Sequence, residues 1–281
     1  MFEVKQELKT GERAMYNTHN CEIIDTTFAD GESPLKESSD LRLVGCIFKW
    51  KYPLWYCKNV NVENTTWLET ARSGIWYTEN ITVKNSFIEA PKQFRRSKYI
   101  YIENTMIPNA EEFLWNCENI TLKNVQARGN YFAMNSKNIT VSDFTLSGNY
   151  AFDGASNIEI HNAKLNSKDS FWNCENVVVY DSIIIGEYLG WNSKNLTFIN
   201  CTIDSNQGMC YMDGIKMVNC KLLNTDLAFE LCSNIDADIK SKVISIKNPI
   251  SGSIKALGVD DIILDKEMID PSKTKIVVGE K

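Results

Sequence analysis

A position that holds tryptophan in five of ten copies recurs about every nineteen residues in this chain of 281 residues, each time after an apolar neighbour. Strand alternation predicts that the apolar neighbour points inward and the aromatic residue outward. Stacked from repeat to repeat, these outward residues form a stripe, here called the aromatic column. Flat rings mixed with carboxylates and an arginine suit sugar rings, whose C–H faces pack on aromatic side chains while their hydroxyl groups meet polar partners. The aromatic column contains Trp55, Trp76, Arg95, Trp115, Met134, Asp153, Trp172, Trp191, Cys210 and Glu230.

The aromatic column and the segment around it supply the candidate substrate-binding residues. They combine indole and phenol rings with two guanidinium groups, so they predict a carbohydrate-interacting surface for an oligosaccharide. The candidates are Arg95, Trp115, Arg128, Tyr150, Trp172, Tyr188 and Trp191.

Asp153 departs most clearly from the column, because neighbouring repeats place Met134 and Trp172 there. A carboxyl group flanked by aromatic rings can have a raised pKa and act as a general acid. Asp169 is expected one coil away, so the two aspartates allow the paired-carboxylate chemistry of glycoside hydrolysis. Asp153 and Asp169 are therefore the candidate catalytic residues of a hydrolase or lyase. A solvated surface aspartate is the alternative interpretation of Asp153.

Two other interpretations of the aromatic column stay open. Aromatic patches are enriched at protein interfaces, so the column could join copies of a non-catalytic scaffold into a homo-oligomer. The rings could also simply cover one another. The sequence leaves the choice between ligand contact, oligomer interface and plain packing undecided.

The repeat that carries the aromatic column also predicts the fold. In each copy an asparagine precedes an aliphatic–polar–aliphatic–polar run, the period-two pattern of a strand with one buried face. A second asparagine follows five residues later and suits a sharp left-handed bend. Three strand-like segments and three bends per copy predict an all-β parallel β-helix with stacked asparagine ladders. The first asparagines are Asn59, Asn80, Asn119, Asn138, Asn157, Asn176, Asn195 and Asn234, and Tyr99 and Gly214 take this place in two copies.

Successive copies are 19 to 21 residues apart. This spacing predicts about 11–12 coils over residues 19–240, with residues 1–18 as an N-terminal cap and residues 241–281 as C-terminal cap strands of one domain. Charged residues beside the asparagines alternate in sign from coil to coil, as at Lys98, Glu118 and Lys137. Stacked neighbours of opposite sign should attract.

Composition excludes several classes of function. The net charge is −6 and no basic cluster exceeds Arg95-Arg96, so no nucleic-acid partner is expected. No span is long enough to cross a membrane, and the start of the chain lacks the apolar run of a signal peptide. His19 and His161 have no metal-ligand spacing around them, so neither a metal nor a cofactor is expected.

The nine cysteines are an odd number. Cys57, Cys117 and Cys174 share one column but lie three coils apart, too far for a disulfide bond. They are interpreted as small buried apolar residues. This use of cysteine, with no signal peptide, predicts a cytoplasmic protein.

The inward aliphatic stacks and asparagine ladders of residues 20–240 resemble the right-handed parallel β-helices of the pectate-lyase-like superfamily. The phrase Trp115-Asn116-Cys117-Glu118-Asn119-Ile120-Thr121 and the tail Lys247-Asn248-Pro249-Ile250-Ser251-Gly252-Ser253 are similar to a prokaryotic domain family of unknown function. The superfamily resemblance implies binding or cleavage of polysaccharides. The aspartates of the pectate-lyase calcium site and the polygalacturonase motifs are missing, however, so the resemblance assigns no catalytic residue.

Overall fold

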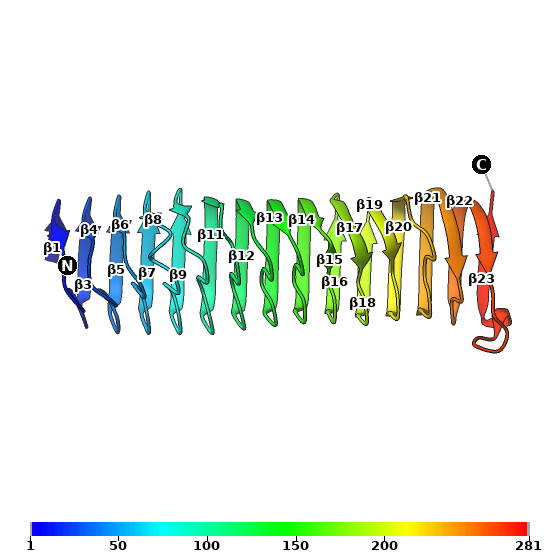
Figure 1. Ribbon diagram of the computed structural model, residues 1–281, viewed down its shortest axis with the longest axis horizontal. Coiled ribbons are helices and arrows are strands. Elements are labelled where there is room, and N and C mark those ends of the chain that lie inside the picture. Colours follow the sequence, from blue (N-terminus) through cyan, green and yellow to red (C-terminus); the bar gives the residue numbers. More distant parts are fainter. Residues whose placement is uncertain (1, 280–281) are drawn as a thin grey trace. The chain divides into compact units, whose positions relative to one another are not determined.

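The computed structural model describes residues 2–279, which form parallel strands and one short 3-10 helix. The fold is a right-handed parallel β-helix, as the sequence predicts. The chain divides into two compact units, Met1–Thr140 and Val141–Lys281. Figure 1 shows the strands within each unit lying side by side.

In the first unit, most coils contribute a first strand of about six residues and a short second strand. The strands are β1 (Phe2–Lys5), β2 (Leu8–Lys9), β3 (His19–Ile24), β4 (Thr27–Phe28), β5 (Ser39–Val44), β6 (Ile47–Phe48), β7 (Lys58–Glu63), β8 (Thr66–Trp67), β9 (Glu79–Lys84), β10 (Phe87–Ile88), β11 (Lys98–Ile107) and β12 (Glu118–Arg128). β13 (Lys137–Gly148) leads into the second unit. First strands pair in parallel in the order β1–β3–β5–β7–β9–β11–β12, and second strands in the order β2–β4–β6–β8–β10–β11.

The second unit repeats this arrangement. Its elements are β14 (Ser156–Ser167), β15 (Asp169–Ser170), β16 (Glu175–Tyr180), β17 (Ile183–Leu189), β18 (Lys194–Ile199), β19 (Thr202–Gly208), β20 (Asp213–Leu223), β21 (Ser233–Lys247), β22 (Gly252–Ile263), the 3-10 helix η1 (Pro271–Lys273) and β23 (Thr274–Val278). The parallel order is β14–β16–β18–β20–β21–β22–β23 on one face and β14–β17–β19–β20 on another.

The terminal segments take part in the coils. β1 and β2, within residues 1–18, pair with β3 and β4, while β22 and β23 continue the stack within residues 241–281. Residues 2–279 therefore form about 15 turns. The sequence predicted fewer because these end coils lack the repeated asparagine phrase.

Apolar positions of the repeat line the inside of each unit, where rings stack from coil to coil. In the first unit Phe48 lies between Phe28 and Trp67, with ring centroids 5.0 and 5.3 Å apart. In the second unit Phe152 and Phe171 stack at 5.5 Å. All five side chains are fully buried, so they contribute the large apolar area and the ring contacts that stabilise each coil on the next.

Asparagine ladders form at the bends, as predicted. Asn80 Nδ2 donates to Asn59 Oδ1 at 2.8 Å, and in the second unit Asn195 Nδ2 donates to Asn176 Oδ1 at 3.2 Å. The backbone of Asn59 is left-handed, with φ of +53°. Asparagine tolerates this conformation, and its side-chain amide bonds to the equivalent amide of the next coil.

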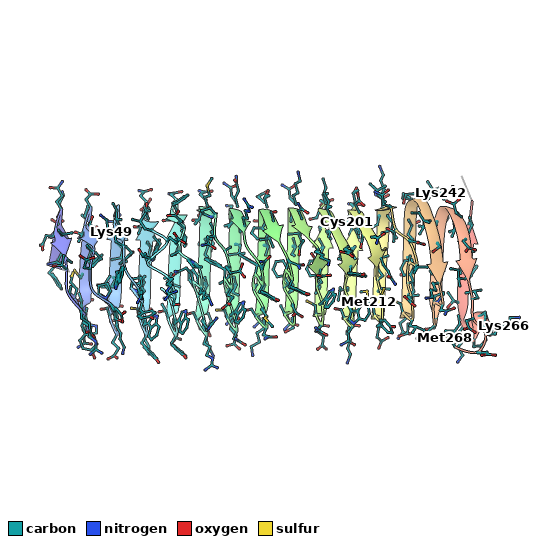
Figure 2. The ribbon with its side chains drawn as sticks, in the orientation of Figure 1. Lys49, Cys201, Met212, Lys242, Lys266 and Met268 are labelled. Carbon is teal, nitrogen blue, oxygen red and sulfur yellow. The ribbon has the colours of Figure 1, made fainter. Side chains whose placement is uncertain are left out.

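The predicted charge alternation and cysteine burial are also present. Glu118 accepts hydrogen bonds from Lys137 and, at 2.8 Å, from Lys98. These bonds lower the pKa of Glu118 to about 2, and the bond from Lys137 has the larger effect. All nine cysteines are free and buried. Cys201 is labelled in Figure 2, as is Met212, which is also buried.

Candidate functional site

In the first unit, the side chains of the aromatic column stack along the coil axis. The rings of Trp55 and Trp76 are parallel to within 7°, with centroids 5.0 Å apart. Tyr52 packs on Trp55 at 4.7 Å. Parallel backbone bridges join Trp76 to Arg95 and Arg95 to Trp115, so the register places each of these side chains over the next.

The indole N–H groups of this stack are already used. Each donates to a backbone carbonyl about one coil further along the chain, which holds the ring flat between coils. The bonds run from Trp55 to Ser73 O (2.6 Å), from Trp76 to Lys92 O (3.0 Å) and from Trp115 to Tyr131 O (2.7 Å). Because stacked neighbours cover the ring faces, the half-buried indoles offer their edges to a ligand and not the flat exposed faces that strand alternation predicts.

Arg95 fills the gap in the indole stack. Its guanidinium carbon lies 4.6 Å from the ring centroid of Trp76 and 4.8 Å from that of Trp115. Nη2 is 2.8 Å from Oε2 of Glu112, while the buried Nε has no partner in the described chain. Arg95 and Trp115 thus touch, whereas Arg128 is exposed at the end of β12. The contacts of Arg95 stabilise the stack.

The turns beside the start of this stack form a cleft. It has a volume of about 400 Å³ and is lined by Trp50, Lys51, Glu69, Thr70, Arg72 and Pro91. Trp50 is 36% exposed, and Lys51 Nζ lies 5.3 Å from its ring centroid. Lys51 is also paired with Glu32 at 3.2 Å. Neither Arg72 nor Glu69 has an ion-pair partner among residues 2–279, so both remain available to a ligand.

Sequence reasoning missed Trp50, because this residue stands outside the repeating column. The available signal was local: Trp50 lies between Lys49 and Lys51, and an indole flanked by two lysines does not fit a buried strand.

In the second unit, the structure brings together most of the remaining predicted residues. Trp172 contacts Tyr150 at 5.5 Å, Tyr188 at 6.5 Å and Trp191 at 5.7 Å between ring centroids. The first two contacts are edge-to-face, and Trp191 continues to Tyr211 at 4.7 Å. The rings again pack mainly on one another, but their tilted geometry makes this cluster less regular than the stack in the first unit.

The two candidate catalytic aspartates have different surroundings. Asp153 Oδ1 accepts a hydrogen bond from Asn173 Nδ2 at 2.9 Å, and Asn192 Nδ2 continues this third ladder to Asn173 Oδ1 at 3.0 Å. Asp169 pairs in register with Tyr188 and is only 2% exposed. Burial raises the pKa of the Asp169 carboxyl.

Two polar atoms of this cluster lack partners. Asp169 Oδ1 and Trp172 Nε1 are buried and have no hydrogen bond in the part of the chain that the structure describes. Unpaired buried polar atoms are costly, and they are often found where function requires them. Asp169 is therefore the stronger candidate for a catalytic residue, whereas the Asp153 carboxylate takes part in an asparagine ladder.

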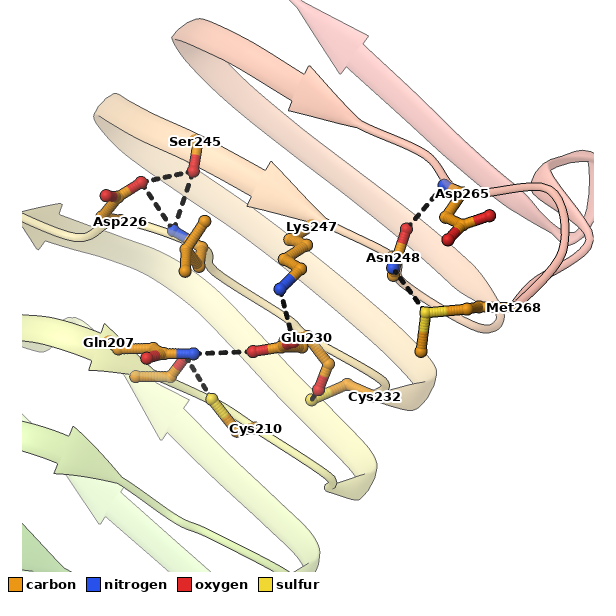
Figure 3. Close-up of polar contacts among 12 residues, drawn as sticks. Gln207, Cys210, Asp226, Glu230, Cys232, Ser245, Lys247, Asn248, Asp265 and Met268 are labelled. Atoms are coloured by element: carbon orange, nitrogen blue, oxygen red, sulfur yellow. Dashed lines mark hydrogen bonds and ion pairs between the residues drawn. The ribbon is translucent and has the colours of Figure 1, made fainter.

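The aromatic column of the second unit ends in a polar cluster (Figure 3). Glu230 Oε2 accepts from Gln207 Nε2 at 2.6 Å, and Oε1 lies 2.8 Å from Lys247 Nζ. Burial raises the pKa of the neighbouring Cys210 thiol to about 12. Glu230 is fully paired and Cys210 remains a thiol, so this cluster joins coils and offers no nucleophile.

Two kinds of feature are absent from the part of the chain that the structure describes. Within residues 2–279, no group of three or more His, Cys, Asp or Glu side chains is placed to hold a metal ion. In the same residues, no helix has the length and apolar character that crossing a membrane requires.

Fold and surface together define a parallel β-helix with stacked aromatic side chains on its outer face. The chain belongs to the family described as Protein of unknown function (DUF3737), whose model matches residues 3–277. Among curated proteins, none matches the chain.

Solved structures with similar folds come from distant proteins. The chain is similar to a double mutant of the tailspike protein of E. coli bacteriophage HK620, with 8% identity, a TM-score of 0.49, and coverage of 98% of this chain and 70% of that one. It is also similar to PfbA, a surface adhesin of Streptococcus pneumoniae, with 12% identity, a TM-score of 0.36, and coverage of 98% and 81%. For the A-module of the mannuronan C-5 epimerase AlgE4 of Azotobacter vinelandii, the identity is 8%, the TM-score is 0.35, and the coverage is 98% and 86%.

Proposed function

We propose that this protein binds oligosaccharides, and that the cleft beside Trp50 in the first unit is the binding site. The observation that carries this proposal is an exposed indole in a cleft of about 400 Å³ that also holds unpaired charged groups. Concave sites with an apolar wall and a few polar groups are the usual form of small-ligand sites. Trp50 supplies the flat platform that the stacked indoles no longer offer.

The polar residues of the cleft can bind the hydroxyl and carboxylate groups of a sugar ligand. Arg72 offers up to five N–H donors and Glu69 offers acceptor oxygens, so together they can bond to neighbouring hydroxyl groups. An unpaired guanidinium also suits the carboxylate of an acidic sugar, because it can bind that group through two parallel hydrogen bonds. The stack from Trp55 to Trp115 supports the cleft by fixing the adjacent turns through the bond from Trp55 to Ser73.

The test is calorimetric titration of the full chain with an oligogalacturonate and with a cello-oligosaccharide. Trp50→Ala should weaken binding of the preferred oligosaccharide by at least about tenfold, which corresponds to about 1.4 kcal/mol. Tyr16→Ala is the matched control, since Tyr16 is an exposed aromatic residue of the same unit outside the cleft. Equal binding by wild type and Trp50→Ala would remove the proposal. If Trp50→Ala instead dissociates an oligomer in sedimentation velocity, the cleft is a self-association surface.

A second candidate function, cleavage of a glycosidic bond, is favoured by the unpaired Asp169 Oδ1 and Trp172 Nε1 in the second unit. We propose Asp169 as the general acid, because burial raises its pKa and a protonated carboxyl can donate to the departing glycosidic oxygen. Asp153 is the second carboxylate, and Tyr150, Tyr188 and Trp191 complete the substrate surface. Because Asp169 is 2% exposed, a substrate reaches it only if the side chains that bury it move.

This second candidate is tested by turnover of the same two oligosaccharides, measured as reducing ends. Asp169→Asn should abolish turnover while retaining the fold, and Asp153→Asn should reduce it. The Trp172→Ala, Trp191→Ala double variant should lose substrate binding in this unit. Full turnover in Asp169→Asn would exclude the general-acid role.

A further inference from the structure

The first asparagine ladder of the first unit is interrupted at one coil, where Tyr99 stands in place of asparagine. Asn80 Nδ2 donates to Asn59 Oδ1 at 2.8 Å, and Asn138 Nδ2 donates to Asn119 Oδ1 at 3.0 Å. Tyr99 has no amide to join these two halves. Asn80 Oδ1 and Asn119 Nδ2 are consequently left without a hydrogen-bond partner in residues 2–279. The break thus exposes one acceptor and one donor.

The interruption coincides with a concave surface. A shallow groove of about 430 Å³ lies over β9, β11, β12 and the start of β13. Its walls include both of the unpaired amides and the hydroxyl groups of the neighbouring outward positions. The residues that matter are Asn80, Thr82, Tyr99, Tyr101, Asn119 and Thr121. We call this surface the ladder-break groove.

Tyr99 is an unfavourable residue for its position unless its ring has a use. Its φ is +55°, in the left-handed region that asparagine tolerates better. The side chain is 54% exposed, so packing does not compensate for the lost amide bonds. The other residues at this position in the first unit all carry a side-chain carbonyl or carboxylate oxygen: Asn20, Asp40, Asn59, Asn80, Asn119 and Asn138. An exposed aromatic residue that interrupts the ladder and lines a groove points to ligand contact.

We propose that the ladder-break groove binds a sugar that carries an acetamido group. One acetamido group supplies both missing partners, an N–H for Asn80 Oδ1 and a C=O for Asn119 Nδ2. In a trans amide these two groups point in opposite directions, as required by partners on the coils either side of Tyr99. The sugar ring then lies against Tyr99 or Tyr101, and its hydroxyl groups reach Thr82 and Thr121.

This site is separate from the one proposed as the main function. The ladder-break groove lies on first strands, and the Trp50 cleft lies on the turns, with no lining residue in common. The ligand class also differs, because the groove selects for an amide and the cleft for hydroxyl or carboxylate groups.

The experiment compares N,N′-diacetylchitobiose with cellobiose, which has hydroxyl groups in place of the acetamido groups, by calorimetric titration of the full chain carrying Trp50→Ala, so that the Trp50 cleft does not contribute. This chain should bind the acetylated disaccharide at least about tenfold more tightly than cellobiose. Tyr99→Asn restores the amide and should join the ladder, raise the unfolding temperature, and weaken this binding by at least about tenfold. The rise in unfolding temperature shows that the variant is folded.

Tyr56→Asn is the matched control. Tyr56 is also a left-handed, exposed tyrosine of the first unit, with φ of +58° and 46% exposure, but it does not line the groove. Binding of the acetylated disaccharide should be unchanged when Tyr56→Asn is added to the Trp50→Ala chain. Absence of binding in the Trp50→Ala chain, equal affinity for the two disaccharides, or unchanged binding after addition of Tyr99→Asn would each overturn the proposal.

Discussion

Replacing Arg95 with alanine tests whether the outer stack of the first unit contributes to its stability. The guanidinium lies 4.6 and 4.8 Å from the two flanking indole centroids. A cation–π contact at a partly exposed site contributes about 1 kcal/mol, and the partly exposed pair with Glu112 adds at most about 1 kcal/mol. Arg95→Ala should therefore destabilise this coil by about 2–3 kcal/mol.

The assay should be local, because solenoid repeats can open without global unfolding. The amides of Arg96 and Trp115 donate to Trp115 O and Phe94 O, both at 3.0 Å, so native-state hydrogen exchange at these positions reports on the coil. A loss of 2–3 kcal/mol corresponds to a drop in protection of about 30- to 140-fold. Arg95→Lys should show a smaller drop, because lysine keeps the charge without the planar stacking group.

Glu112→Gln separates the ion pair from the stack. Its effect should stay below about 1 kcal/mol, since Arg95 remains between the two indoles. If Arg95→Ala changes protection less than about threefold, or no more than Glu112→Gln, then the stacked guanidinium contributes nothing beyond its ion pair and the reasoning is wrong.

Three further predictions concern buried groups. Phe48→Ala should lower the free energy of unfolding by about 3–5 kcal/mol in urea denaturation, because it leaves a cavity between two stacked rings. Burial raises the pKa of Asp169 above its ordinary value of 3.8, so its contribution to stability is complete below that pH and is lost as pH rises through the raised pKa. Thermal unfolding of Asp169→Asn should accordingly show a gain over wild type at neutral pH that disappears in acid. Burial raises the pKa of Cys117 to about 12, so iodoacetamide at about pH 8 should modify this thiol only in the denatured chain, as mass spectrometry would show.

The repeat made the fold predictable, because its asparagines and inward aliphatic residues each have one structural use. Asn59 and its equivalents mark left-handed bends, and the period between them gives the length of a coil. The end coils were harder to predict. β1 pairs with β3, and β23 pairs with β22, through backbone hydrogen bonds. Such bonds place few demands on side-chain type, so they leave little trace in the sequence.

The candidate site was less predictable, because alternation predicts which side chains face outward and not how they lie. It placed Trp76 on the outside but could not show that its ring lies flat on Trp55. Alternation places Asp153 on the outside as well, but it does not show that the carboxylate accepts a hydrogen bond from Asn173 in a ladder. Trp50 lies outside the repeat, so no periodic pattern could identify it.

The charge rows constrain how such a chain can change length. Lys98, Glu118 and Lys137 occupy successive coils and attract one another. Deleting the single coil that carries Glu118 would set Lys98 directly against Lys137, whereas removing two adjacent coils would preserve the order of signs. We therefore expect this chain to tolerate loss or duplication of coils better in pairs, a constraint that the apolar interior alone would not impose.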